Sequence, residues 1–541
     1  MKTTSYKHIF SAALLAMAGT LMSSCIEETF PTGSFTEDQL GGSTSGAASK
    51  AMALGTPATM NVKYFSDRRD WAFGYGAILH IRDIYTQDLA AQNDNDYQQF
   101  YYFGRNEYQG RDYIFMQYLW NFPMKIIATT NLTINSIDAE TANAEGLGWL
   151  GTAHAFRAMC YLDMARAYEF LPSDAYPEAK SSDGKDITGL TVPIVLGTET
   201  EAELRNNPRR TREEMFEFIK SDLDKAIEYM DGFTGGDKTL PHQDCAYGLM
   251  ARLYMWVEDY ENAEKYARLA INASGSQPMT QENGMNTSTG FNDLNQWMWG
   301  SAISKEALYS NLANWTALCV NETWFGYPGP DGGCDNCIDA NVYKRISDTD
   351  WRKLMFKAPA GSALEGKNVF VDDELGAGLH EYASTKFRPG SGNTNDYTIA
   401  CVTAYPLMRV EEMYFIEAEA AAHQDALRGK QLVENFMKTY RDPQYQCRPT
   451  VQEAVVEEIA FQKRIELWGE GQSFFDIKRL NLPVTRGYDG TNHLESECFN
   501  TTTRPAWMSW VIIKTEEDGN AAITGYNNPD PSGVYTLWQG N

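Results

Sequence analysis

The sequence predicts an all-α protein, in which a scaffold of paired helices carries one large irregular insertion. Every long apolar pattern in the 541 residues repeats at helical spacing. The helical patterns occur in pairs separated by segments of very different length, which argues against a regular solenoid. Residues 276–403 differ from the rest, because they are rich in Gly, Asn, Asp, Ser and Thr and too long for an ordinary loop.

The first 24 residues have the pattern of a secretory leader. Lys2 and Lys7 precede an apolar run that ends in Ser23-Ser24-Cys25. Small residues before a cysteine predict cleavage there and attachment of lipid to Cys25, so that acyl chains would hold the mature protein at a membrane. Residues 25–43 are predicted to be a flexible tether, and the mature chain, 25–541, to fold as one compact unit.

The charge balance argues against nucleic acid as a partner. The chain has 72 acidic and 46 basic residues, a formal net charge of -26. Binding to a phosphate backbone requires a basic surface, and no basic cluster stands out in the sequence.

Residues 44–275 are predicted to form the amino-terminal half of the scaffold. The last two helices in this region are expected to pack antiparallel and resemble a tetratricopeptide unit. The expected helices are Thr44–Leu54, Gly148–Phe170, Thr211–Met230, Cys245–Val257 and Glu261–Ile271.

Residues 404–541 contain two further predicted helices. The first is Ala404–Ala422, with Pro406 near its first turn. The second, Glu453–Arg479, is expected to turn a corner at Gly469 and Gly471. Charged residues of both signs lie along its apolar face, and they must pair with one another if they are buried. Such a network is expected to fix how the helices pack against each other rather than to perform chemistry. These charged residues are Arg464, Glu466, Glu470, Asp476 and Arg479.

These carboxy-terminal helices resemble a known family. PLMRVEEMYFIEAEA, followed by KRIELWGEGQSFFDIKR, is similar to the carboxy-terminal signature of the SusD/RagB family of surface lipoproteins. Arg209–Ile227 and Ala246–Ile271 agree with the same family, so the resemblance spans most of the chain in order. Two positions depart from the usual family pattern: Gln462 stands where Glu is common, and Ser473 stands where Arg is common.

The resemblance implies a location, a partner and a ligand face. Family members lie on the outer face of the outer membrane, and Glu27 and Glu28 resemble the acidic tag that directs them there. They bind a nutrient oligomer and serve a SusC-like TonB-dependent barrel. The ligand is held between an amino-terminal segment and the insertion.

Two groups of residues are candidates for the ligand face, and neither group implies a cofactor or a metal ion. Rings that stand among Asn, Gly and Pro have few apolar sequence neighbours, and such rings suit the C–H faces of sugars. Asn93–Asp96 could also bind calcium through oxygen ligands, although a solvated polar turn is favoured. The predicted ligand-binding residues are Trp315, Trp324 and Tyr327 in the insertion, and Trp71, Tyr75, Asn93, Asp96 and Tyr97 in the amino-terminal segment.

The favoured function is binding of a glycan without catalysis, and a peptide is the alternative ligand. A surface glycoside hydrolase would need two carboxyl groups across a cleft, and Glu466 and Glu470 lie instead in the charge network of a core helix. A scaffold that binds only proteins is the third hypothesis. For Cys334 and Cys337, a loop-closing disulfide is favoured over a zinc site or free thiols in an exported protein.

Overall fold

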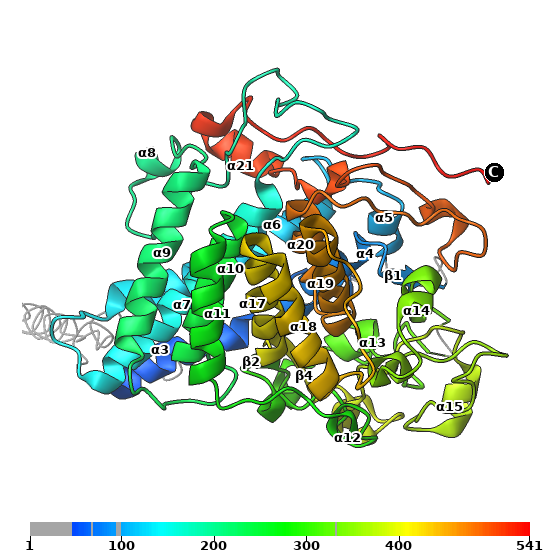
Figure 1. Cartoon of the computed structure of the whole chain (residues 1–541). Coiled ribbons are helices and arrows are strands. Elements are labelled where there is room, and N and C mark those ends of the chain that lie inside the picture. The colour runs from blue at the N-terminus through cyan, green and yellow to red at the C-terminus, as the bar shows by residue number, and fades with distance from the viewer. Residues whose placement is uncertain (1–45, 66–68, 93–98, 330–332, 541) are drawn as a thin grey trace, which may run out of the picture. The chain divides into compact units, whose positions relative to one another are not determined.

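Long helices lie side by side and make up most of the computed structural model, which describes residues 46–65, 69–92, 99–329 and 333–540 (Figure 1). Ser45–Asn541 forms one compact unit. Within the described residues, strands occur only as two two-stranded antiparallel sheets. The prediction of an all-α fold is therefore confirmed. No helix in the described ranges combines the length and the apolar character that crossing a bilayer requires.

The helices of the amino-terminal half agree closely with the sequence pattern. Three of the predicted helices begin at a residue whose side chain accepts a hydrogen bond from the first turn: Asn143, Thr211 and Asp259 accept from the backbone N–H of Gly146, Glu214 and Asn262. The helices of this half are α3 (Gly46–Thr59), α4 (Gly74–Ile84), α5 (Tyr101–Gly104), α6 (Ile114–Ser136), α7 (Ala144–Tyr168), α8 (Glu201–Leu204), α9 (Arg212–Tyr229), α10 (Gln243–Trp256) and α11 (Tyr260–Ala273).

The carboxy-terminal half extends this stack. Helix α11 packs against α17, which also contacts α18 and α19 (Figure 1). Neither α6 nor α18 was predicted from the sequence. The helices of this half are α17 (Val410–Gln424), α18 (Ala426–Tyr440), α19 (Gln452–Glu466), α20 (Ser473–Arg479) and α21 (Lys514–Gly519), with 3-10 turns η5 (Glu495–Glu497), η6 (Ala506–Met508) and η7 (Ala521–Ile523).

One predicted helix is wrong at its start. Ala404–Met408 forms strand β4, and helix α17 begins only at Val410. Proline restricts the residue before it to extended conformations and lacks the N–H that a helix uses. Pro406 therefore sits in a strand, opposite Gly300 of β2.

The predicted corner between α19 and α20 is confirmed. Gly469 and Gly471 have φ angles of 78° and 70°, in the left-handed region that favours glycine. A Cβ atom on Gly471 would also lie 2.8 Å from Cα of Leu79. The corner consequently packs directly onto the backbone of α4.

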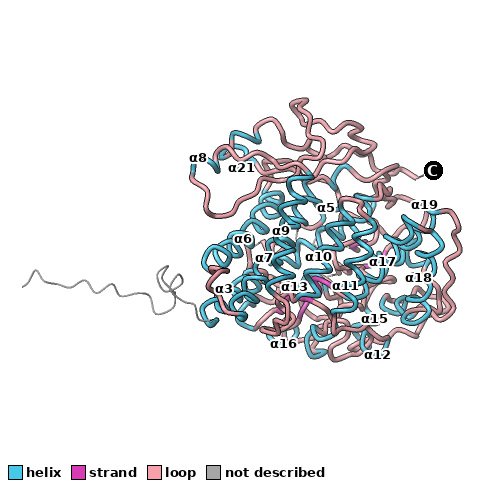
Figure 2. Tube along the Cα trace, turned by 60° about the vertical axis from the view of Figure 1, so that its left-hand side comes forward, coloured by secondary structure: helices cyan, strands magenta, loops and turns pink. Residues whose placement is uncertain are grey.

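The insertion consists of short elements joined by loops, which Figure 2 draws in pink. Its tryptophans Trp297 and Trp299 are fully buried. The elements of this region are α12 (Gln281–Gly284), η1 (Leu294–Gln296), β2 (Trp299–Ala302), η2 (Lys305–Ala307), α13 (Trp315–Cys319), β3 (Asn336–Ile338), α14 (Ala340–Arg345), η3 (Trp351–Met355), α15 (Asp373–Gly378), η4 (Gly390–Gly392) and α16 (Tyr397–Ala400). The domain boundaries at residues 275 and 403 stay a prediction.

Candidate functional site

A two-stranded sheet joins the amino-terminal segment to the insertion. Strand β1 (Leu89–Ala91) pairs antiparallel with β3, with Leu89 opposite Ile338 and Ala90 opposite Cys337. All six residues of the sheet are buried. Two segments that lie about 250 residues apart in the chain are thus held together by backbone hydrogen bonds.

Side chains form a second link between the same two regions. The hydroxyl of Tyr327 donates a hydrogen bond of 2.9 Å to Oδ2 of Asp70. Oδ1 of Asp70 lies 3.3 Å from Nζ of Lys63, and this ammonium lies 4.2 Å from the centroid of the Tyr309 ring. We call Lys63, Asp70, Tyr309 and Tyr327 the junction cluster.

Tyr309 gives the junction cluster an accessible aromatic surface. Its side chain is 62% exposed, although it packs over the ammonium of Lys63. An exposed ring can stack on the apolar face of a sugar, while Asp70 and Lys63 can accept from and donate to its hydroxyls. The side chains of Lys63 and Asp70 are 7% and 14% exposed and pair with each other, so Tyr309 is the most accessible group of the junction cluster.

Trp324 lies in the same loop as Tyr327 and is half-buried. Its ring packs against the apolar cluster that contains Ala90 and Leu375, and its backbone N–H donates to the carbonyl of Thr394 at 2.8 Å. The turn that follows uses Gly326 with φ of 85°, where a Cβ atom would lie 2.9 Å from Ala317. This tight turn sets the direction of both rings.

The structure buries three of the predicted site residues, Trp71, Tyr75 and Trp315. Trp71 has an exposed fraction of 0% and packs against Phe103 and Phe115, and the hydroxyl of Tyr75, buried in α4, donates to Asp163. Trp315 is 2% exposed and stacks on Tyr405 at 5.6 Å between ring centroids. Their burial could not be predicted from their polar sequence neighbours, because the side chains that cover them come from elements distant in the sequence.

The remaining predicted residues stay untested. Asn93, Asp96 and Tyr97 lie outside the described residues, as does Cys25. Trp324 and Tyr327 keep their place as candidates because they lie at the link between the amino-terminal segment and the insertion. Tyr327 is 8% exposed, and its hydroxyl donates to Asp70.

Sequence reasoning missed Lys63, Asp70 and Tyr309. Asp70 stands beside the predicted Trp71, but no pattern in the sequence pairs it with Tyr327, 257 positions away. One feature of the sequence could have indicated that Tyr309 is exposed. Its adjacent apolar residues are only Ala307 and Leu308, and no helical pattern surrounds it. Its pairing with Lys63 became visible only in the folded chain.

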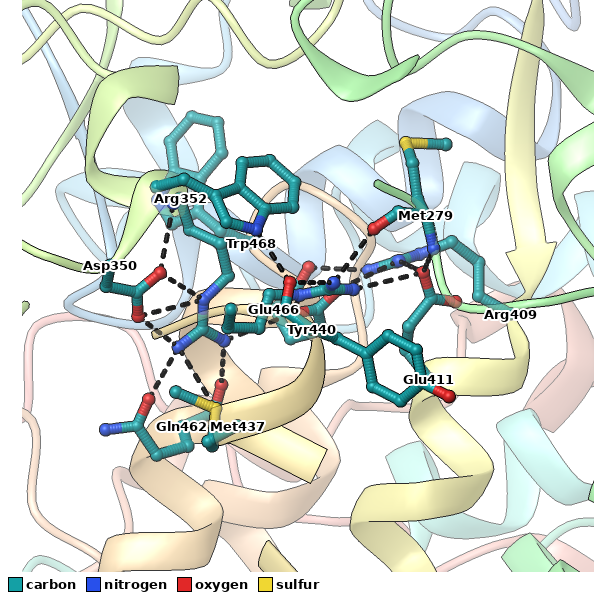
Figure 3. Close-up of polar contacts among 12 residues, drawn as sticks. Met279, Asp350, Arg352, Arg409, Glu411, Met437, Tyr440, Gln462, Glu466 and Trp468 are labelled. Carbon is teal, nitrogen blue, oxygen red and sulfur yellow. Dashed lines mark hydrogen bonds and ion pairs between the residues drawn. The ribbon is translucent and has the colours of Figure 1, made fainter. Parts of the chain in front are cut away.

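The carboxylate of Glu466 lies in an ion-pair network (Figure 3), and Glu470 joins this network through Lys386 and Arg409. Both oxygens of Glu466 accept hydrogen bonds, from Arg409, Arg441 and Arg352 at 2.7 to 3.1 Å. Burial alone would raise the pKa of Glu466, but the three guanidinium groups outweigh it and hold the pKa well below its ordinary value. Glu466 therefore balances the charges of three arginines, and Glu470 those of Lys386 and Arg409.

The departure from the family pattern at position 462 is accommodated in this network. Oε1 of Gln462 accepts from Nη2 of Arg352 at 2.6 Å, and its Nε2 donates to Glu458. Arg352 is also paired with Asp350. A neutral amide is sufficient here, because Asp350 and Glu466 already balance the guanidinium charge.

The predicted disulfide between Cys334 and Cys337 is wrong. Cys337 has a free thiol, buried in strand β3. Burial raises its pKa well above the ordinary value, with Asp335 adding to the effect. A neutral thiol in the sheet acts as a small apolar side chain.

Two family models match the chain, one in the amino-terminal half and one that begins near the end of the insertion. The model described as "Starch-binding associating with outer membrane" matches residues 77–255, and the model described as "SusD family" matches residues 379–529. Trp324 and the whole junction cluster lie outside both matched ranges. No curated protein matches the chain.

Solved structures share this fold over nearly their whole length. A SusD-like carbohydrate binding protein from Bacteroides vulgatus ATCC 8482 is 21% identical, with a TM-score of 0.68, and the match covers 88% of this chain and 97% of that one. A SusD superfamily protein from Bacteroides thetaiotaomicron VPI-5482 is 17% identical, with a TM-score of 0.66 and coverage of 88% and 98%. A laminarin binding SusD-like protein is 15% identical, with a TM-score of 0.57 and coverage of 80% and 91%. At such identities the similarity establishes the fold.

Proposed function

Because the chain belongs to the SusD/RagB family, we propose that it is a cell-surface lipoprotein that binds an oligosaccharide and delivers it to a SusC-like TonB-dependent outer-membrane transporter. Cys25 would hold the lipid anchor, and residues 25–43 would be the tether between the membrane and the folded part. A lipoprotein of this kind needs a transporter, since binding alone moves no ligand across a membrane.

The observation that supports a glycan most strongly is the junction cluster. An exposed ring, a carboxylate and an ammonium meet there, at the link between the amino-terminal segment and the insertion. Sugars bind through this combination of stacking and hydroxyl hydrogen bonds. The carbohydrate binding and laminarin binding proteins of the same fold add support.

The proposal is binding without catalysis. Glycoside hydrolysis requires two carboxyl groups on either side of the scissile bond. At the junction cluster Asp70 is the one carboxylate, and it already pairs with Lys63 and Tyr327. An aromatic surface can also hold a peptide, so a peptide ligand is the second candidate.

The test is a binding screen of the purified mature protein against panels of glycans and peptides. We expect a glycan to bind and to be recovered intact. Tyr309→Ala should weaken that binding roughly tenfold, about 1.4 kcal/mol, because one stacking ring is lost. The melting temperature should change little, since the ring is largely exposed.

A matched control is Tyr526→Ala. Tyr526 also has a lysine over its ring, Lys185 at 5.9 Å, but it lies in the carboxy-terminal segment. Equal losses in the two variants, or none in Tyr309→Ala, would remove the junction cluster from the site. Binding of peptides alone would favour the second candidate, and cleavage of a bound glycan would indicate a hydrolase.

A further inference from the structure

A charged cavity lies within the helical scaffold, separate from the junction cluster. Its volume is about 270 Å³. It is lined by side chains from both halves of the scaffold, from α7, α9 and α10 and from α17, α19 and α20. The family resemblance assigns no role to this place.

The lining is cationic, although the chain as a whole has a net charge of -26. Among the side chains that line the cavity, seven are Arg or Lys and four are acidic. Two carboxylates behind the lining, Asp163 and Glu419, pair with Arg166 and Arg479, and Asp163 is shared with Arg82. The cations of the lining are Arg166, Arg212, Arg252, Lys463, Lys478, Arg479 and Arg504.

Two buried donors of the lining have no hydrogen-bond partner among the described residues. They are Nε of Arg166 and Nη1 of Arg479. The side chains of these two arginines are 11% and 10% exposed. A buried guanidinium N–H without an acceptor costs free energy, so the positive charge of these two arginines is incompletely compensated.

Lys478 adds a buried ammonium that no carboxylate contacts directly. Its Nζ donates to the backbone carbonyls of Arg166, Ala167 and Glu169, at 2.7 to 3.0 Å, at the end of α7. Burial lowers its pKa well below the ordinary value, and the attraction of Glu169 offsets only part of this. An anion in the cavity would favour the charged form of Lys478.

We propose that this cavity is a second binding site, which takes a small molecule bearing a carboxylate, sulfate or phosphate group. The anionic group would accept hydrogen bonds from Arg504 and Arg212, the partly exposed cations of the lining. Arg252 pairs with Glu412 and Lys463 pairs with Asp476, with N–O distances of 2.5 and 2.9 Å, so the charges of these two cations are already balanced.

The cavity has both a mouth and an apolar wall. Arg212 is 29% exposed, and Arg504 is partly exposed with its Nε donating to Asn481, so both can meet an entering anion. The volume is larger than a single oxyanion occupies, and apolar side chains could hold a carbon skeleton beside it. The apolar lining residues are Leu171, Met255, Trp256, Ile416 and Phe475.

The test measures the melting temperature of the mature protein with added glucuronate, sulfate or phosphate, against chloride at equal ionic strength. A ligand that binds only the folded state raises the melting temperature with its concentration. We expect such a rise for at least one probe. Arg504→Gln should weaken the apparent affinity about tenfold, as the loss of one charge-assisted hydrogen bond would. Arg166→Gln should do the same while Arg82 still pairs with Asp163.

The matched control is Arg205→Gln, which removes an exposed arginine that pairs with Glu201 on α8. It should respond to the probes as the parent does, and so should Tyr309→Ala, because the two sites are separate. A response to glucuronate indicates an organic acid, and a response to sulfate or phosphate alone indicates an inorganic anion. Absence of any response beyond chloride, or an equal loss in Arg205→Gln, would overturn the proposal.

Discussion

Trp324 presents one part of its ring to an apolar cluster and leaves the rest accessible. The cluster contains Ala90, Cys337 and Leu375, and Phe370 also packs against it. Trp315, nine positions earlier, is enclosed by Phe387 and Tyr405 instead. The two rings should consequently respond differently to truncation.

Trp324→Ala is expected to weaken ligand binding roughly tenfold, about 1.4 kcal/mol, because a stacking surface is removed. Trp315→Ala should instead cost about 3 to 5 kcal/mol of stability, as a core truncation does. Calorimetric titration and thermal unfolding of both variants separate the two effects. Normal binding by Trp324→Ala, or loss of binding only through unfolding, would exclude this ring from the site.

His80 provides a prediction about pH. Burial of its ring in α4, against Phe100 at 4.8 Å between centroids, lowers its pKa from 6.5 to about 3. Between these values the unfolded chain binds a proton that the folded chain does not. The free energy of unfolding therefore rises with pH across this window, by up to about 1.4 kcal/mol per pH unit. The contribution of His80 to stability decreases as the pH falls below 6.5.

Denaturant unfolding of the parent and of His80→Gln checks this prediction, when it is measured from pH 7 down to pH 4, a range of about three pH units. The substitution should reduce the pH slope, even if it lowers stability at pH 7. His242→Gln, at a partly exposed imidazole, is the control. An unchanged slope in His80→Gln would show that burial of this ring does not govern the acid response.

At the scale of elements, the corner between α19 and α20 is held by ion pairs rather than by apolar packing alone. Glu466 and Glu470 bind Arg409, which precedes α17, and Glu466 also binds Arg441, which follows α18. Arg464 reaches Asp88, next to β1. One corner thereby fixes the position of three other elements.

Glu466→Gln should lower the free energy of unfolding by about 3 to 5 kcal/mol, since it leaves buried guanidinium groups without their counter-charge. Chemical denaturation of the variant measures the loss. Glu201→Gln is the matched control, because its partner Arg205 is exposed and such pairs contribute at most about 1 kcal/mol. A similar small change in both variants would mean that the network does not stabilise the corner.

At the scale of the whole molecule, the folded unit Ser45–Asn541 follows a leader pattern and a predicted tether. The tether length sets how far the ligand face can stand from the membrane. Two predictions concern this arrangement: one about the anchor and one about the transporter.

Cys25→Ala should move the protein from the membrane fraction to the soluble fraction, because the thiol that takes the lipid is absent. Fractionation of cells that express the parent or the variant measures this. Cys447→Ala, at a buried cysteine near α18, should stay with the membrane and serves as the control. The tether proposal fails if Cys25→Ala enters the membrane fraction like the parent.

Mild detergent extracts of cells that also produce the transporter should yield a stable complex of the lipoprotein with a SusC-like barrel. The interface is expected to survive without ligand, since a loosely held lipoprotein could not deliver what it binds. Size-exclusion chromatography followed by mass spectrometry identifies both chains. Recovery of the lipoprotein alone, with the transporter present, would contradict the proposed partnership.

The helices and the family could be predicted from the sequence because their causes are local. Apolar spacing of 3.6 residues, capping residues such as Thr211, and the glycine corner at Gly469 and Gly471 each act over a few positions. The requirement that buried charges pair also followed from the sequence, but the partners of Glu466 did not. They come from elements up to 114 positions away.

By itself, the sequence determined the helical scaffold, its corner and its family, and only the tertiary structure decided which polar-flanked rings reach solvent. Trp71 and Trp315 are buried by distant aromatic side chains, whereas Tyr309 is not. The burial of a residue depends on every element that packs around it, so it cannot be predicted well from the residue's neighbours in the sequence. The pairing of Asp70 with Tyr327 has the same origin, because it exists only where β1 and β3 join two distant segments.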